Sequence, residues 1–329
     1  MSPNRPGERR HSALPWHDRY VVPIRWNKRG LTLAAFVALL VIAGIVWIQF
    51  SGPRSGAALL THLPTRDAAV GHVDIRSIRE AGFVMSANAS ALREPEYEDF
   101  IKRSGFNWEK DLDRITWSFA PTAKFFLVEG RFDWKRLSAF AVEEGGECRD
   151  DFCTVRGSQT GREISFFPLR NDVMAMAVSA DRYAADQLRT RHEADAGHPI
   201  ADPPKAPLWV HFSKFSLSSA EPESPGLRGF ARVLRNTEES TLILEPTQEA
   251  FLLRLDARCS SAETAQALAT DLTKLTALLQ RLLQMEQATP GEGDFASVLA
   301  QGSFQAEASN LHGSWPISRT FLAGLFTEP

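Results

Sequence analysis

The sequence predicts an α+β fold, in which helices cover a mainly antiparallel sheet, preceded by one membrane-spanning helix. Three observations lead to this prediction. Residues 31–50 contain no charged side chain. The rest of the chain alternates short apolar segments with amphipathic ones, as strands and helices do. Several neighbouring strand candidates are joined by only a few residues, too few for the crossover that parallel strands need.

Composition limits the class of protein. The chain has 329 residues, of which 43% are hydrophobic and 23% charged, and these values are typical of a folded protein. Its formal net charge of −3 shows no basic excess, so nucleic acid is not expected as a partner. The three cysteines are too few for a disulfide scaffold or a multi-cysteine zinc module.

The first 50 residues differ from the rest. Residues 1–30 hold four prolines, seven basic and two acidic side chains and no sustained period, which predicts a disordered basic tail. As a helix, residues 31–50 would be about 30 Å long, the thickness of a hydrocarbon core. We therefore predict a transmembrane helix at 31–50 that anchors the chain in the lipid bilayer. A cleaved signal peptide is the main alternative, although its apolar region is usually only about 7–15 residues long.

The flanking charges predict the orientation. Basic residues gather before position 31, whereas Arg54 is the only charged residue between positions 50 and 65. Positive charge stays on the cytoplasmic side, so the N-terminus is expected in the cytoplasm and the body outside the inner membrane. Ala34 and Ala38 have the small-xxx-small spacing that can pair membrane helices. Self-association of the chain through this helix is therefore one alternative.

Elements of the first half follow a linker at 51–66. We expect, in order, a strand at 68–74, helices at 75–83 and 95–104, strands at 115–120 and 124–129, a helix behind Asp133, strands at 152–156, 163–169 and 173–179, and a helix at 180–190. Asp133 is a good N-cap residue. A polar stretch with several prolines at 191–207 then predicts an internal boundary.

After this boundary the same order starts again. We expect a strand at 208–213, a helix at 227–236, strands at 240–244 and 250–258, helices at 261–287 and near 295–300, strands at 304–309 and 312–316, and a helix at 319–326. In the helix at 261–287, five leucines recur at steps of four and three. This face either packs on the sheet or pairs with a second copy of the chain, and its short length favours the sheet.

The repeated order suggests an internal duplication, with one copy at 67–190 and the other at 208–329. Residues 120–134 align with 245–259 at an offset of 125, and 171–182 align with 310–321 at 139. Residues 69–75 align with 209–215 at an offset near 140. Few residues are identical, so chance similarity between two α/β segments is the alternative.

Two pairs of residues are candidate sites. His72 and His211 occupy matching positions, each within an apolar strand, and paired imidazoles can bind a metal ion. The alternative is an ordinary, half-exposed strand histidine in each copy. Cys148 and Cys153 are close in sequence, and outside the cytoplasm a disulfide between them across a hairpin is expected. Cys259 then remains single.

The sequence contains no recognisable catalytic motif. The sequence has no G-x-S-x-G, H-E-x-x-H, phosphate-binding loop or dinucleotide-binding motif, and no cofactor is predicted. The expected function is therefore a membrane-anchored, extracytoplasmic interaction or scaffold module without catalysis, which binds an envelope protein. Two alternatives stay open. One is a small-ligand or lipid-binding domain that uses a groove between the copies, and the other is an envelope hydrolase with an unrecognised site.

One part of the chain has a family resemblance. The segments SGFNWEKDLDR (104–114), EGRFDWKRLSAF (129–140), ISFFPLR (164–170) and LPTRDAAVGHVDIRSIREAG (63–82) resemble single-pass, membrane-anchored proteins of soil bacteria such as acidobacteria. The resemblance covers roughly residues 63–190 and is poor beyond them. It implies a bacterial envelope setting and transfers no catalytic residue, because that family has no assigned activity.

Overall fold

The computed structural model describes residues 59–80, 95–157, 161–190, 203–219, 225–247, 250–285, 295–319 and 321. All of them belong to one compact unit, residues 55–329. The predicted basic tail and the predicted membrane helix at 31–50 lie outside the described residues, as does nearly all of the last predicted helix. None of the described helices is both long and apolar enough to cross a membrane.

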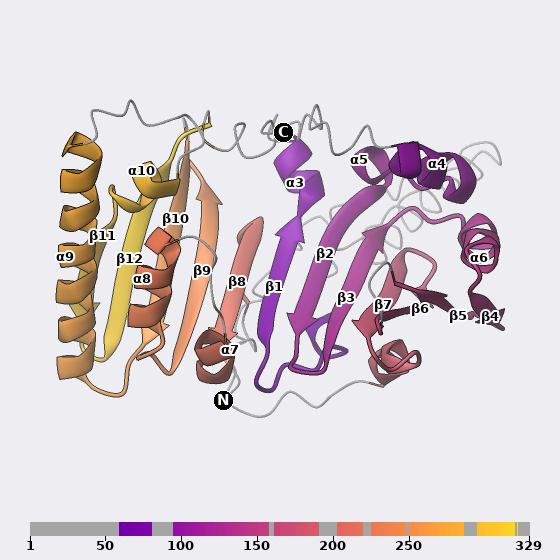
Figure 1. Ribbon diagram of the computed structural model, residues 1–329, viewed down its shortest axis with the longest axis horizontal. Helices are drawn as coiled ribbons and strands as arrows, with labels where there is room; N and C mark the ends of the chain where they lie inside the picture. The colour runs from indigo at the N-terminus through magenta and orange to yellow at the C-terminus, as the bar shows by residue number, and fades with distance from the viewer. Residues whose placement is uncertain are drawn as a thin grey trace, which may run out of the picture. The chain divides into compact units, whose positions relative to one another are not determined.

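The elements of the first half follow the predicted order closely (Figure 1). They are β1 (Ala69–Asp74), α3 (Ile75–Glu80), α4 (Pro95–Ser104), α5 (Trp108–Asp111), β2 (Leu112–Phe119), β3 (Ala123–Gly130), α6 (Trp134–Glu143), β4 (Glu147–Arg149), β5 (Phe152–Arg156), β6 (Glu163–Arg170), β7 (Val173–Ser179) and the 3₁₀ helix η2 (Ala184–Arg189). The Asp133 carboxylate accepts a hydrogen bond from the Arg136 N–H and caps α6, as predicted.

The second half repeats much of this order. Its elements are β8 (Leu208–Ser213), α7 (Lys214–Ser219), α8 (Pro225–Leu234), β9 (Glu239–Pro246), β10 (Phe251–Arg258), α9 (Ala262–Met285), α10 (Phe295–Leu299), β11 (Ser303–Glu307) and β12 (Asn310–Ile317). The strands of both halves join in one twelve-stranded sheet, in the order β11-β12-β10-β9-β8-β1-β2-β3-β7-β6-β5-β4. All neighbouring strands in it are antiparallel, so the predicted α+β class with a mainly antiparallel sheet is confirmed.

The halves meet at the pairing of β1 with β8, where Val70 lies opposite His211 and His72 opposite Trp209. Outward from this pair, the order β1-β2-β3-β7-β6 on one side matches β8-β9-β10-β12-β11 on the other. The first half then continues through β5 to β4. The sequence did not indicate whether the halves share a sheet, and the structure shows that they do.

The strand register differs from the predicted alignment in one hairpin. Thr116 on β2 and Thr241 on β9 correspond at the predicted offset of 125, but their partners on β3 and β10 are Leu127 and Asp256, which are 129 apart. The reason is hairpin length. From Thr116 toward the hairpin turn, β2 and β3 form three more residue pairs. From Thr241 toward the corresponding turn, β9 and β10 form five.

One face of the sheet, which we call the η2 face, carries the core of the first half. Val70, Phe125 and Leu127 on this face pack against η2 and against residues 59–63. The predicted linker at 51–66 is therefore too long, because Leu59 and Leu63 are buried in this core. Two residues of the second half, Trp209 and Ile243, complete the same core.

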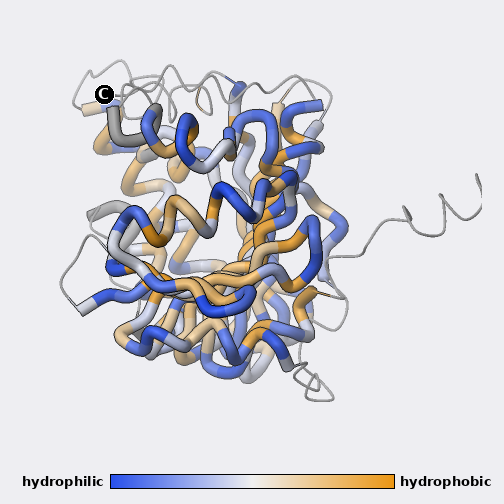
Figure 2. The backbone as a smooth tube through the Cα atoms, turned by 90° about the vertical axis from the view of Figure 1, so that its right-hand side faces the viewer, coloured by the Kyte–Doolittle hydropathy of each residue, from blue (hydrophilic) through white to orange (hydrophobic). Residues whose placement is uncertain are grey.

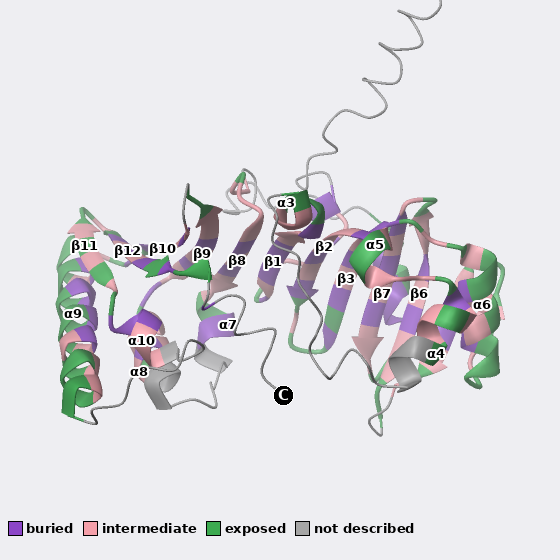
Figure 3. Cartoon of the chain, turned by 90° about the horizontal axis from the view of Figure 1, so that it is seen from above, coloured by how far each residue is buried: buried purple, intermediate pink, exposed green. Residues whose placement is uncertain are grey.

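The opposite face, which we call the α9 face, carries the core of the second half. Leu255, Leu311 and Trp315 lie beneath α8, α9 and α10, which cover this side of the sheet (Figure 3). Leu268 and Leu272 of α9 are buried against it, so the leucine face packs on the sheet over the first half of the helix. Hydrophobic residues concentrate along the strands, and hydrophilic residues are frequent in the helices and connections (Figure 2).

Candidate functional site

Both candidate metal-binding histidines lie on the η2 face and are engaged with threonines. The Nδ1 atom of His72 is 2.9 Å from the Thr116 hydroxyl, and that of His211 is 3.0 Å from the Thr241 hydroxyl. The imidazole of His72 also stacks on Trp209, with ring centroids 6.0 Å apart. Burial lowers the pKa of His72, which favours the neutral imidazole.

Both histidines are buried, and not half-exposed as the alternative interpretation expected, since His72 is 8% exposed and His211 is 4% exposed. The register places them two positions apart on neighbouring strands, as diagonal neighbours. In the part of the chain that is described, no group of three or more potential ligands gathers around a common point. A metal site formed by these two histidines stays a prediction.

A charged cluster lies beside His72 where β1, β2 and β3 run side by side. The Arg114 guanidinium donates from Nε to Asp74 Oδ2 over 2.9 Å, and its Nη1 is 3.6 Å from Glu129 Oε2. Glu129 is buried, and its Oε1 atom has no hydrogen-bond partner among the described residues. The cluster therefore holds two carboxylates in different surroundings around one arginine.

The two carboxylates have opposite pKa shifts. Burial raises the pKa of Glu129, although the nearby Arg114 partly offsets this effect. Burial also acts to raise the pKa of Asp74, but hydrogen bonds from the Ser77 N–H and from Arg114 outweigh it and the pKa is lowered. Such a pair can hold a proton on one group and a charge on the other, as acid–base sites do, and it also ties three central strands together.

An apolar patch covers the α9 face of the first half. We define this patch as Trp117, Phe119, Phe126, Met174 and Met176, which face the same side of β2, β3 and β7. All five side chains are half-buried or exposed, and Phe119 is 39% exposed. Phe119 contacts both Trp117 and Phe126, with ring centroids 6.3 and 5.7 Å apart. The patch is thus one continuous surface.

A disulfide joins Cys148 and Cys153 across β4 and β5, as the sequence predicts for an oxidising compartment. Both sulfur atoms lie near Ser138 of α6, at 3.6 and 3.7 Å from its carbonyl and hydroxyl oxygens. Cys259 is a buried free thiol, and burial raises its pKa, so the reactive thiolate is disfavoured there.

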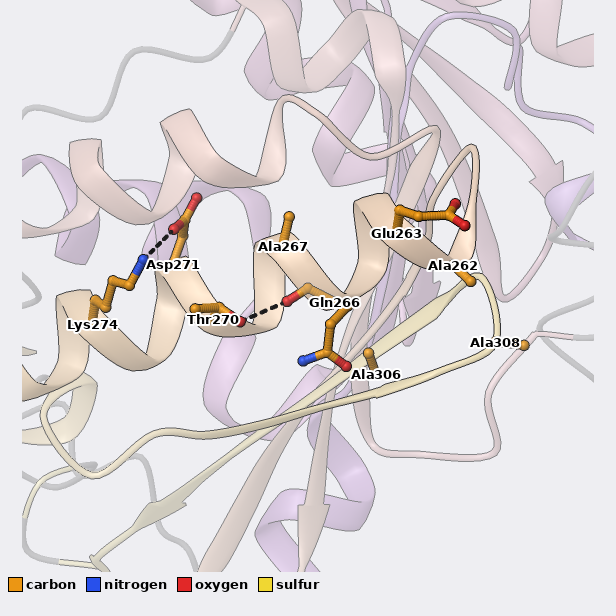
Figure 4. A pocket seen from close by; sticks show the side chains of 9 residues that line it. All are labelled: Ala262, Glu263, Gln266, Ala267, Thr270, Asp271, Lys274, Ala306 and Ala308. Atoms are coloured by element: carbon orange, nitrogen blue, oxygen red, sulfur yellow. Dashed lines mark hydrogen bonds and ion pairs between the residues drawn. The ribbon is translucent and has the colours of Figure 1, made fainter.

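A groove lies between α9 and the edge strand β11, with a volume of about 760 Å³ (Figure 4). Alanines at 262, 267, 306 and 308 leave space within it, and Glu263, Asp271 and Lys274 supply its charges. Lys274 Nζ is 3.4 Å from Asp271 Oδ1, and the Thr270 hydroxyl donates to the Gln266 carbonyl over 2.9 Å. Neither this groove nor the apolar patch could be predicted from the sequence, because each depends on which strand lies at an edge and which face a helix leaves open.

Comparisons with known proteins give little similarity. No protein-family model matches the sequence, and no curated protein does. Among solved structures, crystal form III of TP0453 matches with a TM-score of 0.46 at 10% identity, over 80% of this chain and 96% of that one. Crystal form I of TP0453 matches with a TM-score of 0.42 at 9% identity, over 81% of this chain and 95% of that one. These values are too low to transfer a function.

Proposed function

We propose that the chain is a membrane-anchored interaction module of the bacterial envelope, without catalysis, and that it binds a partner protein through the apolar patch. The observation that carries this proposal is the half-exposed state of Trp117, Phe119 and Phe126 on one continuous sheet face. Aromatic residues and methionine are enriched at protein interfaces, and contiguous apolar surface on a folded protein marks an interaction site.

The second half supports this interpretation by contrast. On the same face of the sheet, its residues Leu255, Leu311 and Trp315 are at most 4% exposed, because α8, α9 and α10 cover them. The patch residues Met174 and Met176 occupy the strand, β7, that corresponds in sheet order to the strand β12 of Leu311 and Trp315. A partner would supply the cover that helices supply in the second half, and flexible methionines adapt well to such a partner.

The anchor is the predicted transmembrane helix at 31–50, with the N-terminus in the cytoplasm and the body outside. The excess of basic residues in 1–30 supports this orientation. Protease added to intact spheroplasts of cells that make the full chain should then remove the body. Protection of the body until the membrane is permeabilised would contradict the proposed orientation.

The matched strand order and contacts support an origin by internal duplication. Besides the two histidine–threonine pairs, the turn after the first strand is capped alike in both halves. Asp74 accepts from the Ser77 N–H at 2.8 Å, and the Ser213 hydroxyl accepts from the Ser216 N–H at 3.2 Å. Asp74 and Ser213 are 139 residues apart in the sequence, and so are Ser77 and Ser216. His72 and His211 have the same separation. A duplicated scaffold whose helices cover one half more fully than the other leaves an open binding face.

Site-specific crosslinking in intact cells tests the binding proposal. A photo-reactive phenylalanine analogue at Phe119 should form a covalent adduct with one recurring envelope protein. The matched control places the same analogue at Ser314, which lies on the polar η2 face of the second half and should give no such adduct. Phe126→Lys should reduce the adduct at Phe119 at least tenfold. Equal adducts at both positions would contradict a binding surface at the patch.

A small-ligand or lipid-binding module is the second candidate. The apolar face continues from the patch past Gly71 to Val210 and Phe212 of β8, so it crosses the junction between the halves. If adducts at Phe119 consist of lipid and not of protein, this candidate replaces the first. Turnover of an esterase, phosphatase, peptidase or glycosidase substrate that disappears with one substitution, for example Glu129→Gln, would instead support a hydrolase and overturn both.

A further inference from the structure

The two edges of the sheet differ in how well they are protected. At one edge, β4 has only three residues, two of them charged, and the Cys148–Cys153 disulfide fixes it to β5. Short length and charge are devices that keep an edge strand from pairing with another chain. At the other edge, β11 has five residues and pairs with β12. No other described strand pairs with it.

The edge strand β11 carries no protective feature in its own sequence or register, and α9 packs alongside it. Its sequence, SFQAE, contains no lysine or proline, and its one charge, Glu307, lies at the end of the strand. Its register with β12 is regular from Ser303 to Glu307, so no bulge turns the outer edge away from solvent. The outer N–H and C=O groups of such a strand are a template for a further strand.

The groove between α9 and β11 lies beside this edge. Along α9 it extends from Ala262 to Lys274, a distance of roughly 18 Å at 1.5 Å per residue. An extended peptide of about six residues has the same length. The alanines that line both walls, with Ala267 on the helix and Ala306 on the strand, leave room for the side chains of such a peptide (Figure 4).

The charges of the groove indicate what kind of peptide fits. Two carboxylates, Glu263 and Asp271, line it against one ammonium group, that of Lys274, which is already paired with Asp271. A basic peptide is therefore complementary, whereas a second copy of this edge would bring its own carboxylates against these.

We propose that β11 and the α9 groove form a strand-addition site, in which an extended, basic segment of a partner protein pairs with β11 as a further strand of the sheet. Main-chain hydrogen bonds to β11 supply affinity, and the alanine-lined groove accepts alternate side chains of the peptide, as in other cases of β-augmentation. This site is separate from the apolar patch, because it lies on the second half at the far end of the strand order.

The test uses the full chain in a neutral detergent and a fluorescent six-residue peptide of alternating lysine and valine. The peptide should bind in an anisotropy titration, and binding should weaken at high salt because charge contributes. Hydrogen exchange should slow at residues 303–307 when the peptide is present. An alternating glutamate–valine peptide, and the basic peptide with methylated backbone nitrogens, should each bind at least tenfold more weakly.

Variants locate the site. Ala267→Trp fills the groove from an exposed helical position, and Glu263→Lys reverses its charge, so each should weaken binding of the basic peptide at least tenfold. The matched controls are Ala139→Trp on α6 and Glu109→Lys on α5, which are exposed elsewhere and should change binding less than twofold.

Three results would overturn the proposal. The first is equal binding of the methylated peptide, which would show that no strand pairing occurs. The second is equal loss of binding in the control variants. The third is a concentration-dependent dimer, seen by sedimentation, that Ala267→Trp abolishes, since the edge would then be used by a second copy of the chain. None of these results depends on the apolar patch.

Discussion

At the scale of single residues, the contact between Gly71 and Trp117 leaves no space for a side chain at position 71. A Cβ atom on Gly71 would lie 2.1 Å from the Trp117 Cζ2 atom. Gly71→Ala should therefore push the indole aside and lower the free energy of unfolding by about 1–3 kcal/mol, measured by urea denaturation.

The matched control for this substitution is Gly229→Ala in α8. A Cβ atom there would meet its nearest neighbour, the Leu275 Cδ2 atom, at an ordinary distance of 3.8 Å. Alanine should leave stability unchanged or raise it by up to about 1 kcal/mol, because it favours a helix more than glycine does. If both alanine variants have the stability of the parent protein, the result contradicts a close contact between Gly71 and the Trp117 indole.

Glu129 gives a residue-scale prediction for pH dependence. Its pKa is raised by burial above the value in the unfolded chain, so the native state binds this proton more tightly. The resulting stability is present below the unfolded pKa and is lost as pH rises through the folded pKa. Glu129→Gln cannot lose that proton, so its stability relative to the parent, measured by urea denaturation over a pH series, should rise as pH increases through the raised folded pKa of Glu129.

Asp74→Asn is the control with the opposite sign. Hydrogen bonds from Ser77 and Arg114 outweigh burial and lower the pKa of Asp74, so its contribution is present above the unfolded pKa and is lost as pH falls. The asparagine variant should therefore become less stable relative to the parent as pH rises. Parallel pH profiles for the two variants would contradict the arrangement of charges around Arg114.

At the scale of elements, the disulfide stabilises the β4–β5 hairpin and the contact of this hairpin with α6. Reduction should lower the free energy of unfolding by about 2 kcal/mol, since the bond closes a very short loop. The measurement is denaturation with and without a reductant, and a Cys148→Ser/Cys153→Ser variant should be insensitive to the reductant. Alkylation of unreduced, denatured protein should label only Cys259, and three labelled thiols would reject the bridge.

The sequence predicted most elements because their signals are local. The mostly apolar runs of β6 and β7, the N-cap Asp133 and the leucine spacing of α9 all act within a few residues, and each element was found within a few residues of its predicted position. The packing of residues 59–63 was missed, since nothing in the local sequence around the three leucines indicates the distant strand face that buries them. The edge position of β11 was missed for the same reason.

At the scale of the whole molecule, the two halves should unfold together. The pairing of β1 with β8 makes the sheet continuous, and Trp209 and Ile243 of the second half complete the core of the first. Trp209→Ala should destabilise the protein by about 3–5 kcal/mol. Native-state hydrogen exchange should show this loss equally in β3 and β10.

Unequal losses would contradict a single cooperative unit. If the amides of β3 lose protection while those of β10 keep it, each half is a separate folding unit and the junction is only an interface. The sequence could not decide between these cases, because the strands that meet at the junction are 139 residues apart and their pairing depends on long-range packing.

If residues 31–50 cross a membrane, as proposed, the burial of Leu59 and Leu63 limits how far the body can move from it. Only eight residues, 51–58, separate the end of the apolar segment from Leu59, and they can span at most about 30 Å. A body anchored at residue 50 would search for its partner by two-dimensional diffusion within a thin layer above the bilayer. A partner anchored in the same membrane would then meet the patch at an effective concentration on the order of millimolar, so that an interface of modest intrinsic affinity would remain occupied.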